Sequence, residues 1–90
     1  MTDVDVRTKI MENLYERRKV SSDGIGAVEI ATLARELGES TTRVAVICSD
    51  LILHKHVDGD GNMMGFVRIS DGGVQYYEEV MRMNSGSRRT

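Results

Sequence analysis

Apolar positions that recur every three or four residues divide the chain into four amphipathic segments. In the first segment, Val6, Ile10 and Leu14 fall on one side of a helix and charged residues fall on the other. Proline is absent, so no segment is interrupted by a residue that lacks a backbone donor. The pattern predicts four helices, at about residues 4–20, 28–37, 41–54 and 71–83.

A tight turn joins the second and third predicted helices. Gly38 supplies the left-handed residue that commonly ends a helix. Ser40 or Thr41 can cap the next helix by accepting a hydrogen bond from an exposed amide. We expect the second helix to bury five apolar residues, which are Ile30, Ala31, Leu33, Ala34 and Leu37. The apolar stripe of the third helix comprises Val44, Ile47, Cys48 and Leu51.

The chain after the third helix has the pattern of a β-hairpin, with strands at 56–59 and 64–70. Between the strands, residues 58–62 (Asp-Gly-Asp-Gly-Asn) tolerate positive φ. The loop at 21–26 is rich in Ser, Asp and Gly, and we expect a strand of one or two residues at 25–27 to pair with the hairpin.

This order of elements predicts a mainly α fold with a small β-hairpin wing, a winged helix-turn-helix, in a single domain at 1–84. Ser70 or Asp71 is expected to cap the last helix. The polar tail at 85–90 is expected to be disordered. The parts of the domain are the helix-turn-helix at about 28–54, the wing at about 55–70 and the C-terminal helix at about 71–83.

Composition and charge restrict the functional classes. No apolar run approaches the roughly 18 residues of a membrane span, and there is no secretory leader, so a cytoplasmic protein without membrane contact is expected. The one cysteine, Cys48, cannot form an intramolecular disulfide, which suits a reducing compartment. Twelve Lys and Arg residues against fourteen Asp and Glu residues give a net charge of −2. A nucleic-acid-binding protein with this balance has to concentrate its cations on one face.

Three local patterns resemble the winged helix-turn-helix domains of prokaryotic transcription regulators, in the style of the MarR and PadR groups. They are Leu33-Ala34-x-x-Leu37-Gly38 in the first helix of the motif, Val44 with Leu51 in the third helix, and Ile69-Ser70-Asp71-Gly72-Gly73 after the wing. The resemblance implies a DNA-binding transcription regulator or accessory factor, which forms dimers and inserts the third helix into the major groove of double-stranded DNA.

On this hypothesis, one short segment and three separate cations form the DNA-binding site. Thr41, Thr42 and Arg43 would contact bases or phosphates, and Ser40 would position the turn. Arg35, Lys55 and Arg68 would add phosphate contacts. The outward face of the third helix is expected to carry Thr41, Thr42, Arg43, Ala45, Val46, Ser49 and Asp50.

The sequence departs from the family pattern in ways that favour an alternative, a protein–protein interaction module that does not bind DNA. Lys55-His56-Val57 stands where DNA-binding members have Gly-Leu-Val or Gly-Leu-Ile, and Asp58 and Asp60 give the wing an acidic tip. Val46, Leu53 and the pair Met63-Met64 would offer an apolar contact surface. A homodimer formed by the first and last helices is also expected, because Tyr76 and Tyr77 are difficult to bury together in a monomer.

Metal and catalytic sites are not expected. The pattern Asp58-x-Asp60-x-Asn62 begins like a calcium loop, but Met63 and Ile69 occupy its glycine and glutamate positions. His54, His56, Cys48 and Asp50 include metal-ligating residue types without the paired spacing of a zinc site. No phosphate loop and no nucleophile with a paired base is present, so neither an enzyme nor a bound cofactor is expected.

Overall fold

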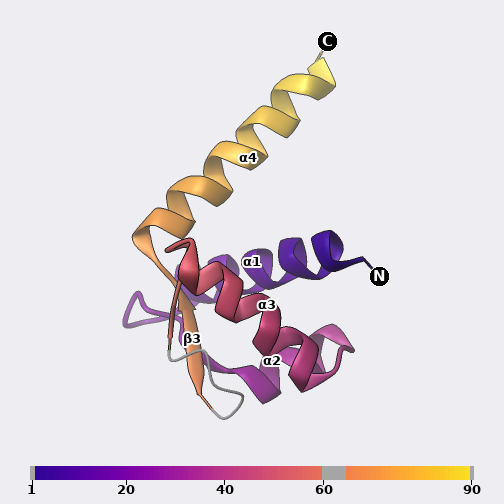
Figure 1. The fold of residues 1–90 in the computed structure, drawn as a ribbon. Helices are drawn as coiled ribbons and strands as arrows, with labels where there is room; N and C mark the ends of the chain where they lie inside the picture. The colour runs from indigo at the N-terminus through magenta and orange to yellow at the C-terminus, as the bar shows by residue number, and fades with distance from the viewer. Residues whose placement is uncertain (1, 60–64, 90) are drawn as a thin grey trace.

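In the computed structural model, residues 2–59 and 65–89 are described, and their fold is mainly helical with a small antiparallel sheet, which confirms the predicted fold class (Figure 1). The elements in chain order are α1 (Asp3–Val20), β1 (Val28–Glu29), α2 (Ile30–Leu37), α3 (Thr41–Leu53), β2 (Val57–Gly59), β3 (Phe66–Ile69) and α4 (Asp71–Arg89). The strand order in the sheet is β1-β3-β2. Helices α1, α2 and α3 and the three strands all contribute residues to a single apolar core.

The first helix begins with a capping box. The Thr2 hydroxyl accepts a hydrogen bond from the Asp5 amide at 3.2 Å, and the Asp5 carboxylate accepts one from the Thr2 amide at 3.3 Å. The predicted core positions Val6, Ile10 and Leu14 are fully buried. This face anchors α1 against α3, β3 and α4.

The turn between α2 and α3 has the predicted chemistry. Gly38 has a φ of 69°, and the amide of Glu39 donates to the Ala34 carbonyl at 3.0 Å, which satisfies the end of α2. The Ser40 hydroxyl then accepts a hydrogen bond from the Arg43 amide at 3.1 Å and caps α3. Both predicted caps are confirmed.

The start of α2 differs from the prediction because a strand precedes it. Val28 pairs with Val67 and Glu29 pairs with Phe66, so α2 begins at Ile30 instead of residue 28. The strand expected at 25–27 is therefore found at 28–29. The prediction that Ala31 is buried was wrong, because this residue lies on the exposed side of the short helix.

All four residues of the predicted apolar stripe of α3 are buried: Val44, Ile47, Cys48 and Leu51. Ala45 is also buried, with an exposed fraction of 5%, so the prediction that it points outward was wrong. The reason is that α3 contacts α1, α2 and β2, and a helix with three neighbours buries a wider face than a single stripe.

The hairpin of β2 and β3 is antiparallel, with Val57 opposite Ile69 and Asp58 opposite Arg68. Its strands are shorter than predicted, since they cover 57–59 and 66–69. Residues 60–64 lie outside the described residues. The expected acidic tip at Asp60 and the expected exposure of Met63-Met64 fall on that segment.

The last helix is held to the end of α3 by its first residues. The Ser70 hydroxyl accepts a hydrogen bond from the Gly73 amide at 2.9 Å, which confirms the predicted cap, and donates one to the Lys55 carbonyl at 2.6 Å. Helix α4 extends to Arg89, past the predicted end at residue 83 and into the segment 85–90 that was expected to be disordered. Figure 1 shows α4 leaving the body of the protein, so that its C-terminal half lies apart from the other elements.

Candidate nucleic-acid interface

The exposed side of α3 is a single stripe along the helix. Thr42, Val46, Ser49 and Leu53 are all exposed and are spaced i, i+4, i+7 and i+11, which places them on one face. We call these four residues the outer face of α3. Val46 is 64% exposed and Leu53 is 78% exposed, although both are apolar. A helix that leaves such residues uncovered presents a surface on which a partner can dock.

Four predicted site residues lie together at the start of α3. Ser40 is the cap, Thr41 is half-buried and Thr42 belongs to the outer face. Arg43 is half-buried and makes two ion pairs, with Asp3 at 2.9 Å and with Glu39 at 3.2 Å. The four predicted residues at 40–43 therefore lie together. Arg43, the one cation among them, already contacts two carboxylates.

The other three predicted cations lie on separate elements. Arg35 is exposed in the last turn of α2. Lys55 is exposed and follows α3, so the length of that helix, about 20 Å, separates it from Arg43. Arg68 is exposed on β3, and its Nε lies 3.6 Å from the Asp58 carboxylate. The predicted cations thus come from α2, from the residue after α3 and from β3, and Lys55 lies at the opposite end of α3 from Arg43.

Ion pairs within the protein engage many of its arginines. Among the described residues, the pairs are Arg7–Asp50, Arg17–Glu36, Arg18–Asp71, Arg43–Asp3, Arg43–Glu39 and Arg68–Asp58. Pairs this exposed contribute little to stability, about 0–1 kcal/mol each. They nevertheless reduce the positive potential that the arginines present to a phosphate backbone.

Asp50 has a different environment from the one predicted. Its carboxylate pairs with Arg7 on α1, and the His54 ring lies 3.7 Å from the same carboxylate oxygen. Asp50 is half-buried between these partners. Pairing with Arg7 reduces the repulsion that this carboxylate would exert on phosphates. No local sequence signal could reveal the Arg7 partner 43 residues away.

An aromatic stack lies next to the end of α3 and was not predicted. The His56 ring stacks on Tyr76 with centroids 4.2 Å apart, and His54 lies 6.2 Å from His56. Burial lowers the pKa of His56 from its ordinary value, and the neighbouring His54 and Arg7 lower it further. The stack joins the connection between α3 and β2 to the first turns of α4.

The four residues considered for zinc, which are His54, His56, Cys48 and Asp50, do not gather around one ion position. Cys48 lies in the core, and burial raises the pKa of its thiol to about 12, which disfavours the thiolate that binds metals. Within residues 2–59 and 65–89, no three His, Cys, Asp or Glu side chains gather around a position for one ion. The calcium-like pattern extends into residues 60–64, outside the described residues.

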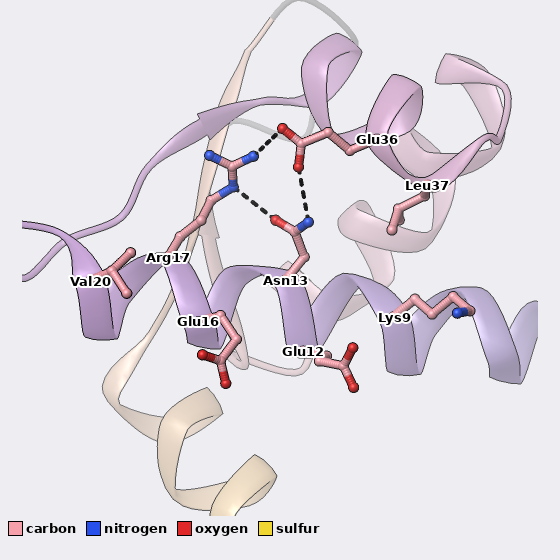
Figure 2. Close-up of a pocket in the computed structure, with 8 residues that line it drawn as sticks. All are labelled: Lys9, Glu12, Asn13, Glu16, Arg17, Val20, Glu36 and Leu37. Atoms are coloured by element: carbon pink, nitrogen blue, oxygen red, sulfur yellow. Dashed lines mark hydrogen bonds and ion pairs between the residues drawn. The ribbon is translucent and has the colours of Figure 1, made fainter.

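An open hollow of about 360 Å³ lies between α1 and α2. Figure 2 shows that three of its lining side chains bind one another: Arg17 donates to Asn13 at 2.8 Å, Asn13 donates to Glu36 at 3.0 Å, and Arg17 also pairs with Glu36. These bonds hold the pKa of Glu36 below its ordinary value. The network joins α1 to α2 through these three side chains.

Comparisons with protein-family models, with curated proteins and with solved structures return no match to this chain. The described part of the chain contains no helix with the length and apolar content needed to cross a bilayer.

Proposed function

We propose that this protein is a DNA-binding winged-helix protein, a transcription regulator or accessory factor, in which α3 enters the major groove of double-stranded DNA. One observation carries the proposal: the second helix of a capped helix-turn-helix leaves one full face uncovered while its other faces pack against the core. The β2–β3 hairpin follows directly and corresponds to the wing.

The outer face of α3 suits contacts with base edges. Thr42 and Ser49 carry hydroxyls, which can donate to or accept from bases. Val46 lies between them and suits apolar contact with the methyl group of thymine. Arg43 would reach a phosphate or a guanine by exchanging its contacts with Asp3 and Glu39 for the nucleic acid. Arg35, Lys55 and Arg68 would add contacts to the backbone of the DNA.

Val46→Glu tests whether the outer face of α3 is the binding surface. A carboxylate at this 64% exposed position would face the phosphates, so we expect affinity for duplex DNA to fall at least about tenfold. The matched control is Val20→Glu, which makes the same change at an 81% exposed position on α1. Fluorescence anisotropy with labelled duplex should show a loss for Val46→Glu alone. Equal affinities for the two variants would place the DNA-binding surface elsewhere.

A second candidate function, protein–protein contact without DNA binding, is favoured by the charges around the same face. Arg43 and Arg68 are paired with carboxylates of the protein itself. The two apolar side chains of the outer face, Val46 and Leu53, are exposed and suit a protein partner. On this proposal the outer face of α3 would bind an amphipathic helix or an apolar patch, and Val46→Glu would abolish that contact instead.

A further inference from the structure

The face of the sheet that points away from the core carries both charged and apolar side chains. Pairing between the strands places Phe66 opposite Glu29 and Arg68 opposite Asp58, and all four residues are exposed. Two hollows of about 250 and 420 Å³ lie against this face, and both are lined by Ile25, Asp58 and Arg68. Because they share these residues, the two hollows meet, and we call them together the sheet groove.

The smaller hollow forms an end of the sheet groove with charges of both signs. Its lining includes two arginines and two aspartates, which are Arg18, Arg68, Asp58 and Asp71. Arg18 donates to Oδ1 of Asp71 at 2.6 Å and to the Ile69 carbonyl at 3.5 Å, so its guanidinium is held in place. The Nε of Arg68 lies 3.6 Å from Oδ2 of Asp58, and within the described residues its two terminal nitrogens have no hydrogen-bond partner. Since a guanidinium can donate five hydrogen bonds, Arg68 keeps donors for a ligand.

The larger hollow forms an apolar end. Phe66, which is 57% exposed, and Ile25, which is 38% exposed, both line it. The Asp23 carboxylate accepts hydrogen bonds from the Ile25 amide, at 2.9 Å, and from the Ser21 hydroxyl, and these bonds fix the loop that carries Ile25. A groove with one apolar end and a few convergent polar groups has the composition of a small-molecule site.

The two ends together match the chemistry of a free amino acid. Its ammonium and carboxylate are bonded to the same carbon, so they lie as close together as Arg68 and Asp58 do on the paired strands. A phosphate or a dicarboxylate would be repelled by Asp58 and Asp71. A peptide carries its terminal charges at opposite ends. A large apolar side chain on the amino acid would cover Phe66 and Ile25.

From this arrangement, we propose that the sheet groove binds a free amino acid with a large apolar side chain. Arg68 donates to the carboxylate of the ligand, Asp58 accepts from its ammonium, and its side chain packs on Phe66 and Ile25. The groove does not include the outer face of α3, so the inference does not depend on the function proposed above. Because Arg68 is also a proposed DNA contact, the binding is measured without DNA.

NMR titration of the isotope-labelled protein with L-phenylalanine and with L-leucine tests the proposal. At least one of them is expected to bind with a Kd of about 1 mM or below and to shift amide resonances of β2, β3 and the loop at 21–27. 3-Phenylpropionate lacks the ammonium and phenethylamine lacks the carboxylate, so each should bind at least about tenfold more weakly than L-phenylalanine. Absence of binding by both amino acids would overturn the proposal. Equal binding of 3-phenylpropionate would also overturn it, because the site would then recognise only an anion.

Variants locate the site. Arg68→Gln and Asp58→Asn should each weaken amino-acid binding at least about tenfold, because each removes one charged partner of the ligand. Phe66→Ala should also weaken it, through loss of the apolar contact. Arg82→Gln is the matched control, because it makes the same change as Arg68→Gln at an exposed arginine on α4 that does not line the groove. Circular dichroism checks that each variant is folded. Unchanged affinity in folded Arg68→Gln or Asp58→Asn would show that the ligand binds elsewhere.

Discussion

Lys55 adopts a left-handed backbone conformation, with a φ of 64°, directly after the last turn of α3. Its amide donates to the Ile52 carbonyl at 2.9 Å, and the His56 amide donates to the Leu51 carbonyl at 3.0 Å. These two bonds form the Schellman ending that glycine usually completes. A side chain at this position costs about 1 kcal/mol relative to glycine, because the Cβ crowds the following carbonyl.

Replacing Lys55 by Gly should therefore raise the free energy of unfolding by up to about 1 kcal/mol, as measured by urea denaturation. Lys55→Ala serves as the control, because it removes the same charge and keeps the Cβ. We expect Lys55→Ala to show no gain. If both variants gained equally, the charge of Lys55 and not its backbone conformation would be responsible.

Among the helices, α4 owes its position to two glycines that allow it to approach the connection between α3 and β2. A Cβ built on Gly73 would lie 1.9 Å from the His56 carbonyl oxygen, a distance that no side chain can occupy. A Cβ on Gly72 would lie 3.2 Å from the Lys55 carbonyl oxygen, which a small shift can relieve. The direction in which α4 leaves the body thus depends mainly on Gly73.

Gly73→Ala should destabilise the protein by about 2–3 kcal/mol, because the first turn of α4 must move away from His56. Gly72→Ala makes the same change one residue earlier and should cost less than about 1 kcal/mol. Urea denaturation of both variants measures the difference. A loss of stability in Gly72→Ala as large as that in Gly73→Ala would contradict this account of the contact.

Elements fixed by local chemistry could be predicted from the sequence, and elements fixed by distant partners could not. The caps at Gly38, Ser40 and Ser70 involve residues within a few positions of one another, and all three are present. The first strand was predicted at 25–27 but lies at 28–29. Its position depends on pairing with Val67, which is 39 residues from Val28 in the sequence. Helix α4 is also longer than predicted, since it ends at Arg89 instead of residue 83.

At the scale of the whole molecule, the candidate site is only partly what the sequence predicted. Ser40, Thr41, Thr42 and Arg43 lie together because they are neighbours in the chain. The pairing of Arg43 with Asp3 spans 40 residues and could not be read from any local pattern. It changes the expected electrostatics, because a protein of net charge −2 then has fewer arginines available for phosphates.

The most direct test of the central claim is the affinity of the wild-type protein for random-sequence duplex DNA, measured by fluorescence anisotropy at low and at moderate salt. If α3 and the wing bind DNA, binding should be micromolar or tighter at low salt and should weaken steeply as salt rises, since each phosphate contact releases counterions. Absence of binding even at low salt would contradict the proposal and would leave the outer face of α3 as a surface for a protein partner.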